Sequence, residues 1–379
     1  MRFSLFCHTL RSCWNHGNAH FLRGIVTELV SLGHQVRIFE PEGSWSYCNL
    51  IQAEGHDYAE ELRATYPLLN IATFNEHSLD LDQAVGDADV VLVHEWNPPS
   101  LIRRMGAHRQ LHDYRLLFHD THHRSVSDPA MPDVKGFDGV LAFGESVSER
   151  YRQNGWAGRV WTWHEAADTR VFFPRPKRHP VADVVWIGNW GDDERAEELR
   201  EFFIDPVREL GLRAKLYGVR YPPEALDLLR RSGIEFAGWI PNFRAPQVYG
   251  QARFTVHVPR RPYTRELPGV PTIRVFEALA CGTPLISAPW EDCESLFTEG
   301  EDFLMAKDKH QMKKLMHMLL ADGEGAQALA DHGRATVLRR HTCRHRVDEL
   351  LRICAELHAQ SGNAHVAEAS TRAPMEATV

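Results

Sequence analysis

The sequence lacks the features of a membrane-spanning, secreted or nucleic-acid-binding protein. No apolar run approaches the roughly 20 residues that a membrane-spanning helix needs. The first residues lack the apolar core and small-residue cleavage site of a signal peptide. The 43 Lys and Arg are outnumbered by 51 Asp and Glu, a formal net charge of −8, which argues against a broad nucleic-acid surface. We therefore expect a cytoplasmic protein with no transmembrane segment and no nucleic-acid partner.

The chain also lacks cysteine pairs and an evident metal-binding motif. Its seven cysteines are scattered and none forms a CxxC pair, which favours reduced thiols. Among the 22 histidines, two groups suggest metal ligands: His122 with His123, and His341 with Cys343 and His345. Sequence neighbours rarely point at one ion, and the second group has no partner cluster. We therefore expect no structural zinc and no metal cofactor.

The pattern that is present is an alternation of strands and helices over 379 residues, a length sufficient for two domains. This alternation predicts parallel sheets with crossover helices, an α/β fold. The expected strands are 2–7, 35–40, 68–74, 89–94, 115–119, 138–143 and 159–164, then 183–188, 213–218, 234–238, 254–258 and 285–288. The expected helices include 19–32, 54–65, 99–112, 145–154, 193–210, 291–297, 309–321 and 325–340.

A proline-bearing segment without periodicity, residues 167–177, separates the two halves. We expect a first Rossmann-like domain over 1–174, a second over 175–340 and a last helix over 341–359. Residues 360–379 are small and polar, which predicts a disordered tail.

The most informative segment, residues 269–284, reads as a loop that opens a helix and then a turn into a strand. Pro271 suits a helix start, and Thr272 can cap the free amides there. Those amides and the helix dipole form a phosphate site. Arg274 and Glu277 share a face, so Arg274 and the amides would hold a diphosphate and Glu277 would accept ribose hydroxyls. The alternative is an ordinary amphipathic helix with a surface ion pair.

Polar side chains follow two strands of the first half. His94 ends one strand and Asp120 follows the next, and ligand groups collect where parallel strands end. Asp120 could act as a base towards an acceptor hydroxyl or belong to a solvated loop, and His94 could be a structural hydrogen-bonding residue. The loop after the first strand contains Gly17 but no GxGxxG, so a nicotinamide oxidoreductase is a distant alternative.

Residues 276–290, FEALACGTPLISAPW, closely resemble the donor-binding helix of GT-B glycosyltransferases, most of all the group-1 branch and its CgeB-like proteins. The resemblance implies two Rossmann-like domains and a last helix that crosses back onto the first. It implies that Glu277 binds the ribose of a nucleotide-sugar. It also implies that Gly17 lets the backbone approach the donor phosphate or the acceptor, although a simple helix-entry glycine fits equally well.

Three further positions follow from this resemblance. Residues 89–100 resemble the H-E-P-x-x-P-S segment of phosphatidylinositol mannosyltransferase-like enzymes, which implies that His94 lies in the catalytic cleft. Residues 236–241 resemble the segment whose backbone contacts the base, where Trp239 either takes part or belongs to the core. Retaining members carry an acid eight residues before the ribose glutamate; here the nearest acid is Glu266, so the stereochemical outcome stays open.

The phosphate-binding residues depart from the related pattern. Related enzymes place an arginine just after the glycine that corresponds to Gly188 and a lysine soon after, whereas this chain has Asn189 and no nearby lysine. Guanidinium groups suit phosphate oxygens. The candidate replacements are Arg195, Arg220, Arg260, Arg261 and Arg274, with the Arg260–Arg261 pair first.

The expected function is transfer of a sugar from a UDP- or GDP-linked donor to a glycan, lipid or small-molecule acceptor. Arginines and helix amides would stabilise the leaving diphosphate without a metal. Two alternatives stay open. One is a non-catalytic GT-B protein that binds nucleotide-sugars, and the other is a non-hydrolysing sugar-nucleotide epimerase.

Overall fold

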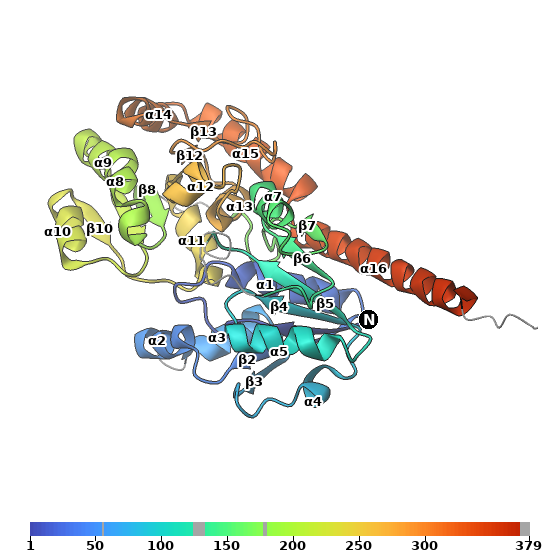
Figure 1. The fold of residues 1–379 in the computed structure, drawn as a ribbon. Helices are drawn as coiled ribbons and strands as arrows, with labels where there is room; N and C mark the ends of the chain where they lie inside the picture. Colours follow the sequence, from blue (N-terminus) through green and yellow to red (C-terminus); the bar gives the residue numbers. More distant parts are fainter. Residues whose placement is uncertain (55–56, 124–132, 177–179, 372–379) are drawn as a thin grey trace, which may run out of the picture.

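The computed structural model describes residues 1–54, 57–123, 133–176 and 180–371. Each half of the chain forms a parallel sheet with helices packed around it, and the two halves lie one above the other in Figure 1. The α/β fold with two parallel sheets that the alternation predicted is therefore confirmed.

The first sheet has seven parallel strands in the order β3-β2-β1-β4-β5-β6-β7. The strands are β1 Arg2–Phe6, β2 Gln35–Pro41, β3 Ile71–Phe74, β4 Val90–His94, β5 Arg115–Asp120, β6 Gly139–Ala142 and β7 Val160–Thr162. The helices are α1 Ala19–Ser31, α2 Trp45–Glu54, α3 Asp57–Thr65, α4 Leu81–Val85, α5 Pro99–Arg109 and α7 Glu145–Gln153. β4 and β5 are buried along their whole length, as central strands covered on both faces must be.

The second sheet has six parallel strands in the order β10-β9-β8-β11-β12-β13. They are β8 Ala182–Ile187, β9 Ala214–Tyr217, β10 Ile234–Phe236, β11 Ala252–His257, β12 Leu285–Ser287 and β13 Leu304–Met305. The helices are α8 Ala196–Leu199, α9 Asp205–Leu210, α10 Pro223–Arg231, α11 Ala245–Gly250, α12 Arg261–Arg265, α13 Ile273–Ala280, α14 Lys309–Ala321 and α15 Gly323–Arg340. Two short 3₁₀ helices, η1 Asp192–Glu194 and η3 Asn242–Arg244, and a π-helical segment between α8 and α9, η2 Arg200–Ile204, complete this half.

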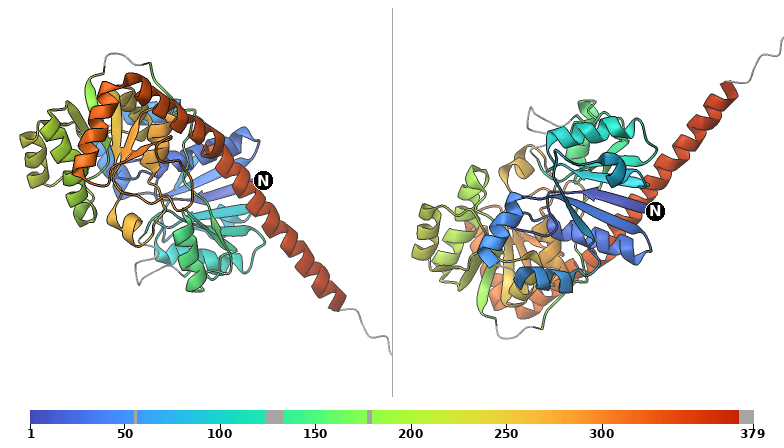
Figure 2. Two further views of the ribbon diagram at one scale, coloured as in Figure 1. Left: turned by 90° about the horizontal axis from the view of Figure 1, so that it is seen from above. Right: turned by 90° about the horizontal axis from the view of Figure 1, so that it is seen from below.

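The last helix, α16 Cys343–Thr371, returns from the second domain to the first, as both views of Figure 2 show. The Trp163 indole donates to the Arg346 carbonyl at 2.8 Å, and Leu350 is buried in the cluster that contains Phe21 of α1. The predicted crossing helix is confirmed. It continues past residue 359 to Thr371, and residues 372–379 lie outside the described residues.

Two stretches of backbone join the domains side by side. The chain leaves the first domain after Ala167 and re-enters it at Thr342, and these two residues form a parallel β-bridge. The Ala167 amide donates to the His341 carbonyl, and the Cys343 amide donates to the Ala167 carbonyl, both at 3.0 Å. The two sheets lie within residues 2–162 and 182–305, and the domain boundaries drawn from the sequence stay predictions.

The predicted helix at 291–297 is wrong: the structure has turns there. The Asp292 carboxylate accepts the amides of Leu296 at 3.1 Å and Phe297 at 2.7 Å, so these amides do not enter a helix. Ser295 adopts φ 53°, in the left-handed region that ends regular helix. A side chain that binds nearby amides competes with helix formation, and here it prevails.

Candidate active site

Both sheets have the strand order of a doubly wound fold, in which ligands bind where the order reverses. The order reverses between β1 and β4 in the first sheet and between β8 and β11 in the second. A cleft of about 1450 Å³, open to solvent, is lined by the loops that follow these strands.

The loop after β1 forms much of the first-domain wall and is fixed by Glu40 at the end of β2. The Glu40 carboxylate is buried and accepts the Thr9 hydroxyl at 3.0 Å, the Arg11 amide at 2.9 Å, the Arg11 guanidinium at 2.8 Å and the Leu10 amide. This carboxylate therefore positions the loop that carries Gly17.

His94 lies one layer behind the cleft surface. Its Nδ1 accepts the Trp96 amide at 3.3 Å, and its Nε2 donates to the Thr121 hydroxyl at 3.0 Å, which donates to Glu95 at 2.7 Å. Burial, and next the nearby His119, hold the pKa of His94 well below its usual value, so the ring is neutral. The residue that lines the cleft in front of it is His16, 6.1 Å away between ring centroids.

Asp120 and Glu266, the other two predicted catalytic residues, do not line the cleft. Asp120 is buried and accepts the Tyr151 hydroxyl at 2.8 Å. Glu266 is exposed at the C-terminal end of α12. Their predicted roles gain no support from the geometry.

Glu165, which the sequence analysis missed, is the sole carboxylate among the described residues that line the cleft. It follows β7 and accepts the Asn18 side-chain amide at 2.6 Å. Burial raises its pKa to about 7, with a smaller contribution from the charge of Glu277. Its place just after a strand end was a signal that could have found it, since ligand groups collect at such ends.

The start of α13 lies against the loop of the first domain that contains Gly17. A Cβ on Gly17 would lie 3.2 Å from the Ile273 methyl group, so a glycine permits this close approach. Thr272 is the N-cap residue, but its side chain makes no capping hydrogen bond. Thr272 and Arg274 line the cleft, and so does Gly17.

Glu277 is fully buried beneath Arg274 and does not itself line the cleft. It forms ion pairs with Arg274 and with His20, the latter at 2.8 Å. Burial raises its pKa, but the charges of Arg274 and His20 outweigh burial and hold the pKa below its usual value. In this arrangement the carboxylate orients the Arg274 guanidinium, and the predicted contact with ribose stays a prediction.

Asn189 brings two arginines together at the second switch point. Its side-chain oxygen accepts Arg195 at 2.6 Å and Arg260 at 3.0 Å, and its amide donates to Asn15 of the first domain at 2.7 Å. Burial, and next the charge of Arg260, lower the pKa of Arg195 to about 9. Both arginines line the cleft.

The remaining predicted donor residues divide between the cleft and the surface. Gly188, Arg220 and Trp239 line the cleft. A Cβ on Gly188 would lie 2.2 Å from the Trp186 ring, so this position requires glycine. Arg261 is directed away and pairs with Glu198 at 2.6 Å and Glu197 at 2.9 Å. Of the pair placed first from the sequence, only Arg260 lines the cleft.

Comparison with known proteins agrees with this architecture. Residues 195–352 match the profile of the family described as "Glycosyl transferase-like". Sucrose-phosphate synthase from Thermosynechococcus elongatus is similar at 14% identity and a TM-score of 0.65, over 95% of this chain and 100% of that one. Anabaena HepE, solved with UDP and glucose, is similar at 12% identity and a TM-score of 0.64, over 94% of this chain and 99% of that one.

A third similar structure is an α-glucosyltransferase solved with UDP and DNA, at 12% identity and a TM-score of 0.70, over 94% of this chain and 99% of that one. No curated protein matches the sequence significantly. Within the described residues, no helix combines the length and apolar character needed to cross a membrane. The chain therefore has the GT-B fold of these glycosyltransferases, and its residues 195–352 match the glycosyl transferase-like family.

Proposed function

We propose that the protein is a glycosyltransferase that moves a sugar from a nucleotide-sugar to an acceptor bound on the first domain. One observation carries the proposal. The start of α13, Arg195 and Arg260 approach the cleft from the second domain, and the cleft carboxylate Glu165 belongs to the first. Cationic groups for a diphosphate thus line the same cleft as a group able to take a proton from an acceptor hydroxyl.

The donor would bind with its diphosphate between the amides of α13 and the two arginines that contact Asn189. Charge-assisted hydrogen bonds to phosphate are strong, and the helix dipole adds to them. These groups supply the positive charge that the leaving diphosphate needs, so we propose metal-independent transfer. HepE binds UDP-glucose and T4 phage BGT has UDP-glucose as substrate, which favours UDP here over the GDP alternative.

The acceptor would bind at the aromatic end of the cleft. Trp45 and Trp96 line this end with 40% and 38% of their surface exposed, and His8 lies between them with ring centroids at 5.0 and 6.3 Å. Burial lowers the pKa of His8 to about 4, so the ring is neutral. Flat, uncharged aromatic side chains suit the apolar face of a sugar ring. Among glycan, lipid and small-molecule acceptors we therefore favour a glycan.

Two alternatives predict different products. A non-catalytic nucleotide-sugar-binding protein would bind UDP without turnover, and the missing lysine is what favours it. A sugar-nucleotide epimerase would release a free, altered nucleotide-sugar. Membership of the CgeB-like group and a cytoplasmic location stay proposals.

Adjacent arginines provide the test. Wild type, Arg260→Ala and Arg261→Ala would be titrated with UDP and GDP by calorimetry, with and without Mg²⁺. UDP should bind without Mg²⁺, Arg260→Ala should weaken it about 10- to 100-fold because charge-assisted hydrogen bonds contribute about 1.5–3 kcal/mol, and Arg261→Ala should change it less than about twofold.

Failure of wild type to bind any nucleoside diphosphate would overturn the proposal, and equal losses in both variants would overturn the assignment to Arg260. UDP release from UDP-glucose would then be followed with an oligosaccharide acceptor panel. Binding without release would favour the non-catalytic alternative.

A further inference from the structure

A hydrogen bond between two asparagines joins the domains directly beside the two arginines of the proposed diphosphate site. The Asn189 side-chain nitrogen donates to the Asn15 side-chain oxygen at 2.7 Å. The Asn189 side-chain oxygen accepts Arg195 at 2.6 Å and Arg260 at 3.0 Å. An amide carries its acceptor and its donors on different edges, so one side chain contacts both arginines and, at its other edge, the first domain.

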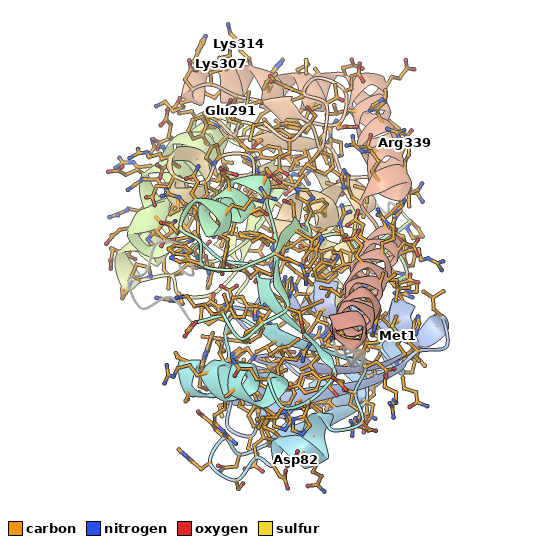
Figure 3. The ribbon with its side chains drawn as sticks, turned by 45° about the vertical axis from the view of Figure 1, so that its right-hand side comes forward. Met1, Asp82, Glu291, Lys307, Lys314 and Arg339 are labelled. Atoms are coloured by element: carbon orange, nitrogen blue, oxygen red, sulfur yellow. The ribbon has the colours of Figure 1, made fainter. Side chains whose placement is uncertain are left out.

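Asn15 belongs to the first domain and Asn189 to the second. Figure 3 shows the two domains stacked, with Asp82 of the first and Lys314 of the second at opposite ends of the molecule. Each asparagine is half-buried and lines the cleft. Movement of one domain away from the other would therefore break the bond between the asparagines, whereas the contacts within the second domain could persist.

The two guanidinium groups need a partner between them, because like charges at close range repel each other. Arg195 also donates to the backbone carbonyls of Asn189 at 2.6 Å and Val258 at 3.2 Å, and Arg260 pairs with Glu194. The Asn189 side-chain oxygen is the contact that the two groups share. An amide oxygen carries only a partial negative charge, so it holds two cations together only while it is correctly oriented.

The backbone conformation of Asn15 suits it to orient that amide. Its φ is 52°, in the left-handed region that glycine adopts readily and asparagine tolerates better than most other residues. The loop is anchored nearby by Glu40, whose carboxylate accepts the Arg11 amide at 2.9 Å. Glycine would satisfy the backbone alone, whereas asparagine adds an acceptor for the Asn189 amide.

We propose that Asn15 is a positioning residue of the first domain, which acts through Asn189 to hold Arg195 and Arg260 in place for the diphosphate. The diphosphate site is then complete only while the two domains are together, so donor binding and domain approach favour each other. This inference rests on the proposed function, because that function assigns the two arginines to the diphosphate. It makes a site whose arginines belong to the second domain depend on a residue of the first.

The test removes the acceptor and keeps the backbone conformation. Asn15→Gly retains access to the left-handed region and loses the side-chain oxygen. The matched control is Ser295→Gly, at an exposed residue with φ 53° that does not line the cleft. Wild type, these two variants, Asn189→Ala and the double variant Asn15→Gly/Asn189→Ala would be titrated with UDP by calorimetry. Circular dichroism would verify that each variant is folded.

Asn15→Gly should bind UDP about three- to tenfold more weakly than wild type, the effect of losing one hydrogen bond between uncharged groups. Ser295→Gly should stay within about twofold of wild type. Because Asn15 acts through Asn189, the double variant should bind UDP within about twofold of Asn189→Ala. Uridine, which lacks the diphosphate, should bind wild type and Asn15→Gly equally in an NMR titration.

UDP binding by wild type with an unchanged affinity in Asn15→Gly would overturn the positioning role and leave the proposed function standing. Additive losses in the double variant would also overturn it, because Asn15 would then act independently of Asn189. So would an equal loss of uridine affinity, because the effect would not concern the diphosphate. Failure of wild type to bind any nucleoside diphosphate would instead overturn the proposed function, and this inference with it.

Discussion

Asn189 brings two arginines together at the proposed diphosphate site. By the sequence resemblance an arginine is expected at this position, whereas here the Asn189 side-chain oxygen accepts hydrogen bonds from Arg195 and Arg260. The sequence predicted both replacements because guanidinium groups suit phosphate. The sequence could not predict which of Arg260 and Arg261 lines the cleft, because neighbouring side chains at a helix start point in different directions. In the structure two glutamates of α8 pair with Arg261 and hold it away from the cleft.

Glu165→Gln tests the cleft carboxylate, with Glu266→Gln as the matched control outside the cleft. As a base Glu165 must be deprotonated, so wild-type activity should rise with pH up to about 7 and then level off. Glu165→Gln should lose about 10²–10⁴-fold in kcat and lack this rise, whereas Glu266→Gln should stay near wild type. Initial rates of UDP release between pH 5 and 9 check this.

The same variant should be more stable than wild type at pH 8. Because the folded-state pKa of Glu165 is raised, the folded state binds more protons between the unfolded pKa of about 4.3 and about 7. The contribution of Glu165 to the free energy of unfolding of wild type is therefore fully present below pH about 4.3 and is lost as the pH rises to about 7 and above. In urea unfolding at pH 8, the free energy of unfolding of Glu165→Gln should exceed that of wild type by about 1–3 kcal/mol. This difference should shrink near pH 5, and a Glu165→Gln variant less stable than wild type at pH 8 would contradict the raised pKa of Glu165.

At the scale of elements, sequence periodicity located most strands, but it did not find a strand that depends on its pairing with a neighbour. β12 was expected at 285–288 and is Leu285–Ser287, because an apolar run after a Gly-Thr-Pro turn is a strong local signal. β13 has two residues and exists only through its pairing with β12.

The crossing helix offers a stability prediction. Leu350 of α16 is fully buried in the cluster that includes α1, so Leu350→Ala should lower the free energy of unfolding by about 2–5 kcal/mol. Leu338 on α15 is 40% exposed, and Leu338→Ala should cost less than about 1 kcal/mol. Urea denaturation of both variants gives the comparison, and equal losses would contradict the packing of α16.

At the scale of the whole molecule, charges link the two domains beside the cleft. Arg244, before α11, pairs with Glu61 at 2.9 Å and with Glu54 at 3.0 Å. Both acids belong to first-domain helices. Such partly exposed pairs contribute little to stability, about 0–1 kcal/mol each, but reversing the charge would place three carboxylates together.

Arg244→Glu should therefore separate the domains without unfolding them. Small-angle X-ray scattering should give a larger radius of gyration than wild type, and saturating UDP should reduce the difference. Arg213→Glu is the control, because Arg213 pairs with Asp183 inside the second domain. An unchanged radius of gyration in Arg244→Glu, or an equal increase in the control, would show that these ion pairs do not hold the two domains together.

The bridge between Ala167 and Thr342 has a consequence for how such separation can occur. The backbone passes between the domains at these two places, and hydrogen bonds tie the two passages to each other. Two tethered crossings leave one easy degree of freedom, a rotation about the line through the bridge. We therefore expect the domains to rotate about this line as a hinge. The part of the cleft farthest from the bridge should widen most, whereas Glu165, two residues before Ala167, should move little.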